Sequence, residues 1–492
     1  MIRYWRGDGR CPAPFGVRGE RIVVSGIPGV RVARIRLAVL AGLFVAAVFL
    51  AALCANAETF YVAPSGSDQN AGTAVAPWKT IQGGVDRLAA GDQLIVRAGT
   101  YPERVSTRAA GTAASPITIS AYAGEVVTLH RLYLRHDYVR LSGLKFAGMA
   151  DVFRILYVDG DHCRIENCHI DAGNETRKGI EGAVYSSSAN VAVSCVISNC
   201  VIERINNTTA IMVWGKDWIV EDCTVRDCAD ADFVRVFGPG HRIRGNTVHN
   251  FVDGPGLNHL DFIQTFGDSL QTPGLQEMAC RDVVVERNYS YDMGAQLCQM
   301  TWDGVPTIGH VVFRNNIFRN FLGAGNVSIP ATEWYNNIFY NVNQVSAHPL
   351  CFVGNAHNTI LKNNMFIGCG SDPSKTWQGW YLISGPTGCV ADYNLVTSGQ
   401  AGGYAAKHAG YFLEPHGISG GNPCLVSPDT HDFHLLADSP AIDKGTPIAS
   451  FGDDRDGYAR GSLWDIGPHE YGAGVTGPRP EAPTNLRSVP GP

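Results

Sequence analysis

The residues best suited to chemistry lie in two short segments whose sequences can be overlaid. Residues 230–238 read Asp-Ala-Asp-Phe-Val-Arg-Val-Phe-Gly, and residues 259–267 read His-Leu-Asp-Phe-Ile-Gln-Thr-Phe-Gly. The overlay pairs these residues on neighbouring strands: Asp230 with His259, Asp232 with Asp261, Arg235 with Gln264, and Phe237 with Phe266. Carboxylates, an imidazole, a guanidinium and an amide in such a set can bind a sugar and move its protons.

A β-elimination on a uronic-acid polymer requires three roles: neutralising the carboxylate, removing the C5 proton and protonating the leaving oxygen. Arg235 or a divalent cation such as calcium would neutralise the carboxylate. His259 is the best base by intrinsic pKa, and Tyr289 or Tyr291 would donate the proton. C5-epimerisation shares the first step and returns the proton on the opposite face. These residues therefore predict a lyase or an epimerase without separating the two.

The same segments support two other interpretations. Hydrolysis of a glycosidic bond uses paired carboxylates, for which Asp232 and Asp261 are the candidates. A structural role is equally concrete, because Asp at the entrance of a strand commonly stabilises a turn. Strict alternation would point Asp232 and Asp261 into the core, where an unpaired carboxylate is costly. We therefore expect the strand to begin later, or these carboxylates to bond turn N–H groups.

Aromatic side chains recur at the end of each overlaid strand. Residues 210–215 fit the same register and add Trp214 to Phe237 and Phe266 on the outward parity. Flat rings beside Arg235 and Gln264 would suit the CH faces and hydroxyls of a sugar. Alternatively, a loop such as 268–280 covers this aromatic row.

A repeated phrase must position these segments. It reads Ile-Glu-Asn-Cys, Ile-Ser-Asn-Cys or Asn-Asn-Ile-Phe, with equivalent positions at 144, 168, 200, 223, 246, 288, 316, 337, 364 and 394. Units this short cannot hold two packed helices, and their period-2 apolar stretches predict stacked β coils. The step of 42 from 246 to 288 exceeds its neighbours of 23. We interpret the extra residues as containing one more strand.

Cysteine and asparagine recur at one position of the phrase. Cys168, Cys200 and Cys223 would form a column at strand spacing, which is within reach of a disulfide. A column of three cannot pair completely, so stacked buried thiols are favoured over a disulfide framework, with metal binding as a third alternative. The Asn-Asn pairs would form a hydrogen-bonded ladder along the stack.

Both ends of this region resemble the secreted bacterial β-helix proteins of the pectate-lyase-like superfamily. The opening resemblance lies in 60–68, 77–82 and 90–101, and the closing one in 439–443 and 465–471. The resemblance implies an all-β fold, a single right-handed parallel β-helix with a short N-terminal capping helix. The resemblance does not predict a particular activity, because the superfamily includes lyases, epimerases, hydrolases and proteins without known chemistry.

The N-terminus predicts export. Basic residues precede an apolar run at 37–53, which Ala-Asn-Ala at 55–57 follows, in the order of a signal peptide cleaved before Glu58. A membrane anchor is the rival, but the run is short for a span. The predicted domains are 1–57 extension and signal peptide, 58–116 N-terminal cap and first coils, 117–400 β-helix repeats, 401–472 closing segment, and 473–492 Pro-rich linker or tail.

Charge and composition limit the partners. A formal net charge of -6 provides no basic patch for phosphates, so nucleic acid is excluded and polysaccharide is favoured. We expect a monomer, extracellular or at the cell surface, with no stable membrane anchor. The alternative outside enzymology is a non-catalytic surface or glycan-binding protein, in which the β-helix is a rigid spacer.

Overall fold

The computed structural model contains one compact unit that begins at Ala57. The residues it describes are 57–147, 154–176, 178–182, 191–254, 260–267, 276–343, 349–369, 381–384, 386–397, 402–405 and 411–473. The predicted signal segment at 37–53 lies outside them. Among the described residues, no helix combines the length and apolar character needed to cross a membrane.

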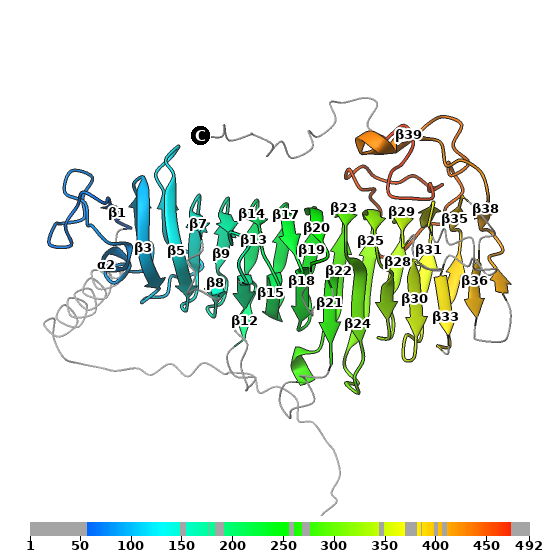
Figure 1. The fold of residues 1–492 in the computed structure, drawn as a ribbon, viewed down its shortest axis with the longest axis horizontal. Helices are drawn as coiled ribbons and strands as arrows, with labels where there is room; N and C mark the ends of the chain where they lie inside the picture. Colours follow the sequence, from blue (N-terminus) through cyan, green and yellow to red (C-terminus); the bar gives the residue numbers. More distant parts are fainter. Residues whose placement is uncertain are drawn as a thin grey trace, which may run out of the picture. The chain divides into compact units, whose positions relative to one another are not determined.

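Short parallel strands stack as successive coils, which confirms the predicted all-β fold (Figure 1). The first ladder is a thirteen-stranded sheet: β1 (Thr59–Val62), β2 (Gln93–Val96), β4 (Ile117–Ala121), β6 (Val139–Ser142), β9 (Arg164–Glu166), β13 (Val196–Ser198), β16 (Ile219–Glu221), β19 (Arg242–Arg244), β22 (Arg281–Glu286), β25 (Gly309–Arg314), β28 (Glu333–Tyr335), β31 (Ile360–Lys362) and β34 (Val390–Asp392).

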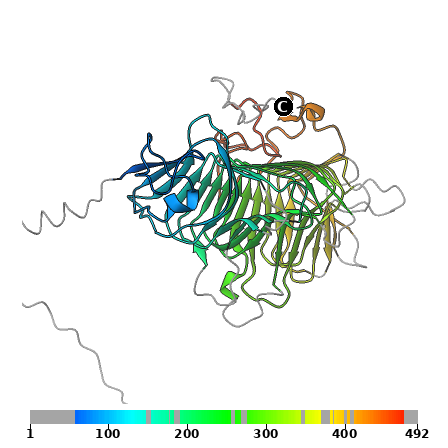
Figure 2. The same ribbon diagram turned by 60° about the vertical axis from the view of Figure 1, so that its left-hand side comes forward.

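A 25-stranded sheet contains two further ladders. Figure 2 shows the stack of coils from an oblique direction. One contains β7 (Lys145–Ala147), β10 (His169–Asp171), β14 (Val201–Glu203), β17 (Thr224–Ala229), β20 (Thr247–Val252), β23 (Tyr289–Met293), β26 (Ile317–Phe321), β29 (Ile338–Val342), β32 (Met365–Ile367), β35 (Leu395–Val396) and β38 (Ile418–Ser419).

The other ladder contains β3 (Gly99–Ser106), β5 (Val127–Leu134), β8 (Arg154–Val158), β11 (Lys178–Gly182), β15 (Thr209–Lys216), β18 (Asp232–Phe237), β21 (Asp261–Phe266), β24 (Gln296–Thr301), β27 (Gly325–Val327), β30 (Leu350–Val353), β33 (Tyr381–Ser384), β36 (Gly402–Ala405) and antiparallel β37 (Tyr411–Leu413), with β12 (Ala192–Val193) beside β15. Strands of a typical middle coil therefore form three faces around one core.

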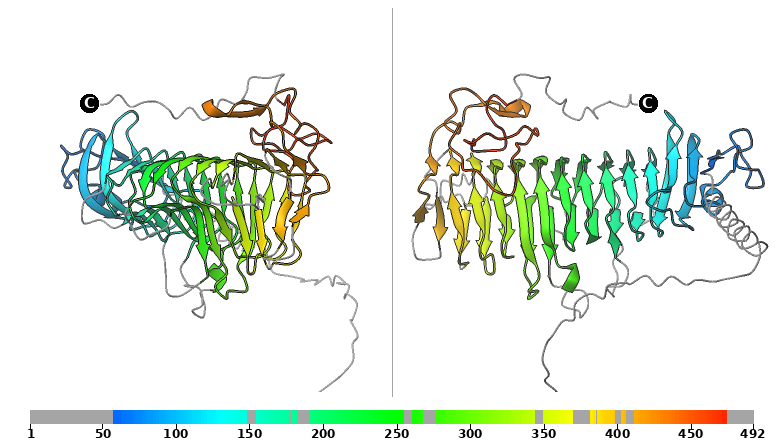
Figure 3. Two further views of the ribbon diagram at one scale, coloured as in Figure 1. Left: turned by 45° about the vertical axis from the view of Figure 1, so that its right-hand side comes forward. Right: turned by 180° about the vertical axis from the view of Figure 1, so that it is seen from behind.

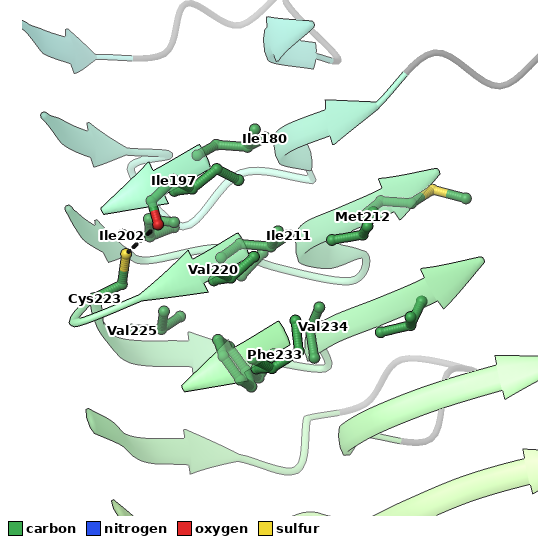
Figure 4. Packing of buried hydrophobic residues seen from close by; sticks show 14 of the residues in the cluster. Ile180, Ile197, Ile202, Ile211, Met212, Val220, Cys223, Val225, Phe233 and Val234 are labelled. Carbon is green, nitrogen blue, oxygen red and sulfur yellow. Dashed lines mark hydrogen bonds between the residues drawn. The ribbon is translucent and has the colours of Figure 1, made fainter. Parts of the chain in front are cut away.

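The predicted repeat positions are confirmed by the strand register. Ile165, Ile197, Val220 and Ile243 are successive partners in the first ladder, and each is buried. Inward side chains of all three faces meet in one continuous apolar core (Figure 4). Burial of these aliphatic side chains against the coils above and below is the main stabilising term of such a stack.

The long step from 246 to 288 is a single coil, so the prediction of one extra strand is wrong. β19 pairs directly with β22, while β18 belongs to the preceding coil and β21 to this one. The additional residues are therefore insertions before and after β21. The described part of the second insertion includes the short helix η2 (Gln276–Met278).

The predicted asparagine ladder is confirmed. In each pair of adjacent coils, the side-chain and main-chain N–H groups of one Asn donate to Oδ1 of the next over 2.9–3.1 Å. Glu414 ends the column by accepting from Asn394. The ladder contains Asn246, Asn288, Asn316, Asn337, Asn364 and Asn394. These bonds satisfy amides that the core would otherwise leave unpaired.

Free thiols extend this column towards the N-terminus, as predicted. Cys168, Cys200 and Cys223 are buried, and the main-chain N–H of Cys223 donates to Oδ1 of Asn246. All cysteines of the described residues are free. The Cys200 thiol bonds main-chain oxygen instead, at 3.3 Å from Ser198.

The predicted N-terminal helix is present as α2 (Ile81–Val85). The Thr80 hydroxyl accepts from the N–H of Gly83 and caps the first turn. Ile81 and Val85 are buried in the core, which places the helix at the start of the stack. Leu88 lies beyond the end of the helix but is also buried.

A closing segment covers one face of the last coils (Figure 3). It contains η3 (Pro428–Thr430) and the antiparallel pair β39 (Leu425–Ser427) and β40 (Asp432–Leu435). Phe433 and Ile466 pack with Ile317 and Met365 in a second apolar cluster. The segment thus packs on the outer surface of the ladder that contains β23, β26 and β29.

Candidate active site

Three adjacent strands carry the predicted site. Arg235 of β18 lies beside Gln264 of β21, and on its other side beside Met212 of β15. The overlay that predicted this register is confirmed by both pairings. The guanidinium and the amide therefore occupy adjacent rungs of one outward column.

The alternation of side chains shifts by one residue at the start of β18. Phe233 and Val234 are consecutive, yet both are buried in the core (Figure 4). Asp232 therefore lies on the side of Arg235, whose Nε donates to its Oδ2 at 2.5 Å. The main-chain N–H of Asp261 donates to Oδ1 of Asp232 at 2.9 Å. The expectation of a later strand start is wrong, because β18 begins at Asp232 and β21 at Asp261. The Asp232 carboxylate does bond a main-chain N–H, but that N–H belongs to the adjacent strand β21 and not to a turn.

Burial controls the proton affinity of Asp232. Its side chain has 0% exposure, and loss of solvation raises its pKa to about 7. The Arg235 guanidinium opposes this rise, whereas the neighbouring Asp261 carboxyl adds to it. Near neutral pH, Asp232 is therefore present both as a carboxylate, which can accept a proton, and as a carboxylic acid, which can donate one.

Asp230 fits the turn interpretation. It has φ of 48°, is buried, and its Oδ1 accepts from the N–H of Gly254 at 2.8 Å. His259, its predicted neighbour, lies outside the described residues. Asp230 therefore holds the connection after β20, and its predicted substrate contact has no support in this geometry.

The aromatic row exists but is largely covered. Trp214 and Phe237 have ring centroids 4.7 Å apart, and Phe237 and Phe266 4.9 Å apart. Trp214 is 3% and Phe237 0% exposed, so the prediction of an open stacking surface at these two rings is wrong. Helix η2 packs against β15 and buries Met278, in agreement with the alternative of a covering loop. Phe266 remains half-buried at the edge of the row.

The two predicted proton donors lie in another ladder. Tyr289 and Tyr291 belong to β23 and pair with Thr247 and His249 of β20. Burial raises the pKa of both phenols. Tyr289 also contacts His431 of the closing segment. The structure therefore does not bring these tyrosines into the column of Arg235 and Gln264.

Additional polar residues extend the column in both directions. Glu181 precedes Met212 and pairs with Arg154, while Gln299 and then Asn326 follow Gln264. Sequence comparison missed them because β11 and β24 lack the terminal Phe-Gly by which the other strands were aligned. Their outward parity in the repeat was the available signal.

Two family models match the chain and together span most of the coils. A Pel9A-like right-handed β-helix region matches residues 60–200, and a general right-handed β-helix region matches residues 154–343. With the parallel stack and the capped first coil, these matches place the chain among the pectate-lyase-like right-handed β-helix proteins.

Curated relatives align over shorter regions. Pectate lyase PEL9 of Emericella nidulans is 42% identical over 86 residues, 17% of this chain and 20% of its own. The uncharacterized protein YwoF of Bacillus subtilis is 31% identical over 136 residues, 23% of this chain and 29% of its own. The chain thus spans less than a third of either relative.

One solved structure aligns with most of the chain. Pectate lyase Pel9A aligns with 84% of this chain and 96% of its own, at 16% identity and a TM-score of 0.45.

Proposed function

We propose that the chain is an extracellular polysaccharide-active enzyme, a lyase or C5-epimerase of an acidic glycan. The observation that carries this proposal is the buried Asp232 carboxyl, held between the Arg235 guanidinium and the Asp261 N–H with a pKa raised to about 7. A perturbed carboxyl beside a cation, on the outer face of a β-helix, is typical of proton-transfer sites. The pectate lyase among the aligned relatives supports the same class.

The column provides groups for the first step of either reaction. The ionised form of Asp232 accepts the C5 proton, or His259 does so. Arg235 uses Nε on Asp232, and its remaining N–H groups bind the uronate carboxylate. Gln264 and Gln299 bond sugar hydroxyls from successive coils. Loss of the C4 substituent, whose oxygen takes a proton from the protonated base or from water, then gives an unsaturated product, whereas reprotonation at C5 on the opposite face gives the epimer.

A glycoside hydrolase is the second candidate. Asp232 and Asp261 are both fully buried on adjacent coils, and the raised pKa of Asp232 suits a general acid. In this reaction Asp232 protonates the leaving oxygen and Asp261 acts as base or nucleophile. The products differ, because hydrolysis creates reducing ends without unsaturation.

The test is a panel of uronate and neutral polysaccharides incubated with the purified protein. Unsaturated uronates are followed by ultraviolet absorbance, epimers by NMR and hydrolysis by reducing ends. Asp232→Asn and His259→Ala should each abolish turnover, while Asp86→Asn, an exposed acid paired with Arg108, should not change it. Absence of turnover on the whole panel would contradict the proposed enzyme and favour the non-catalytic alternative, in which the β-helix is a rigid spacer.

Export is proposed from the order of basic, apolar and small residues before Glu58. Mass spectrometry of protein from the culture medium should find Glu58 at the N-terminus. An intact N-terminus in the membrane fraction would favour an anchor.

A further inference from the structure

A cluster of two histidines and one aspartate lies in the closing segment, away from the predicted catalytic column. His434 comes from β40, Asp456 from the turn closed by the bridge between Asp453 and Ala459, and His469 from the stretch after that turn. One ligand atom of each residue lies within 4.8 Å of the other two. Three segments distant in sequence thus converge on one point.

We propose that His434, Asp456 and His469 bind a divalent transition-metal ion of the Zn²⁺ type. Oδ2 of Asp456 lies 2.8 Å from Nε2 of His434 and 3.2 Å from Nδ1 of His469. Zinc bonds of about 2.0–2.2 Å in a tetrahedron separate donor atoms by roughly 3.3 Å. Only a small outward shift of these side chains would therefore admit the ion.

The second nitrogen of His434 is already oriented for this role. Its Nδ1–H donates to Oδ1 of Asp432 at 2.6 Å. A carboxylate on the far nitrogen fixes the ring and makes the near nitrogen a better ligand, as in carboxylate–histidine–zinc sites. Asp432 is therefore a positioning residue, distinct from the three ligands.

Charge distinguishes this cluster from a similar one on the β-helix. His169, Asp171 and Glu203 also converge, but Arg204 pairs with Asp171 and Arg226 with Glu203. Those guanidinium groups already occupy the carboxylates. Among the described ion pairs, Asp456 has only His434 and His469 as partners.

The guanidinium that precedes Asp456 in sequence bonds the coils. Arg455 donates from Nη1 to the main-chain oxygen atoms of Asn288 and Asn315, so its charge is directed at the coils. The side chains of His434 and Asp456 remain 26% and 32% exposed. Solvent therefore reaches the ion and supplies the fourth ligand of a three-residue site.

The ion would link three positions within the closing segment. Asp456 lies 22 residues after His434 and 13 before His469, so one ion closes two loops. It would bind the folded chain and stabilise it by mass action, since the unfolded chain does not bring these residues together.

Calorimetric titration of the purified protein with Zn²⁺, beside Mg²⁺ and Ca²⁺, tests the site. We expect one Zn²⁺ per chain and a higher thermal midpoint with Zn²⁺. His434→Ala and Asp456→Asn should weaken binding by at least ~10-fold, and Asp432→Asn by ~10–100-fold. Bound Co²⁺ should show the intense visible bands of tetrahedral coordination.

Two variants serve as matched controls. His416→Ala removes a histidine whose described ion pair is with Asp392, and His169→Ala removes the histidine of the other cluster. Both should bind Zn²⁺ as the parent does. Unchanged binding in His434→Ala, or loss of binding in His169→Ala, overturns the proposal. So does the absence of binding in a parent protein that is folded by circular dichroism.

Discussion

The main-chain N–H of Asp261 donates to Oδ1 of Asp232 over 2.9 Å, joining two adjacent coils through a side chain. Because the donor is main chain, the bond survives any change of the Asp261 side chain. Asp232 also accepts from Nε of Arg235. The two acids, although equivalent in sequence, therefore differ in their structural roles.

Truncation should reveal this difference. Asp232→Ala removes the acceptor of the Asp261 N–H and of Arg235 Nε and should lower the free energy of unfolding by about 3–5 kcal/mol. Asp261→Ala keeps both of those bonds and should cost less. Urea denaturation of the two variants provides the comparison, and a larger loss for Asp261→Ala would contradict it.

Stability should also depend on pH through Asp232. Its pKa is about 7 in the folded chain and near its ordinary value of 3.8 in the unfolded chain. The folded state binds the extra proton between these values, so the contribution is complete below about pH 4 and disappears as pH rises through about 7. The difference amounts to about 4 kcal/mol.

Asp232→Asn should remove this slope, because the amide does not titrate. Denaturation of the parent and the variant from pH 4 to pH 8 measures it. The stability of the parent relative to the variant should fall as pH rises. A constant difference would show that another group controls the pH dependence.

The asparagine ladder should be worth more than any surface amide. The Asn316 side chain accepts from the main chain and side chain of Asn288, and donates to Val285 and Asn337. Asn316→Ala should destabilise the chain by about 3–5 kcal/mol. Asn70→Ala, which removes one exposed bond to Pro77, should cost less than about 1 kcal/mol. Equal losses would contradict a specific role of the ladder.

The strand register could be predicted because equivalent positions of successive coils carry side chains, such as Asn, that bond to one another. A slip by one residue would separate Asn246 from Asn288 and turn Ile243 outward, so the phrase itself determines the pairing. The overlay of Arg235 with Gln264 followed from the same logic, since each lies two positions before the Phe of a terminal Phe-Gly.

Features that depend on the cross-section of a coil could not be read in this way. Tyr289 lies in a different ladder from Gln264 because each coil turns between them, and local alternation does not show where. Trp214 is buried although its strand position predicts an outward side chain, and β15 is contacted by η2, which is remote in sequence. The shift at Phe233 and Val234 is likewise set by the core rather than by the strand's own pattern.

The thiol column gives the last prediction. Cys168, Cys200 and Cys223 are free and at most 2% exposed, and the adjacent Cys200 thiol and burial raise the pKa of Cys168. Thiolate is the reactive form, so an aromatic disulfide reagent should modify these residues only after unfolding. Half-buried Cys351, Cys389 and Cys424 should react in the native protein, and Cys424→Ser should remove one of the three thiols labelled in that phase. A chain beginning at Glu58 should release twelve thiols in denaturant. Fewer than twelve without prior reduction would indicate disulfides, and rapid native labelling of Cys200 would contradict its burial.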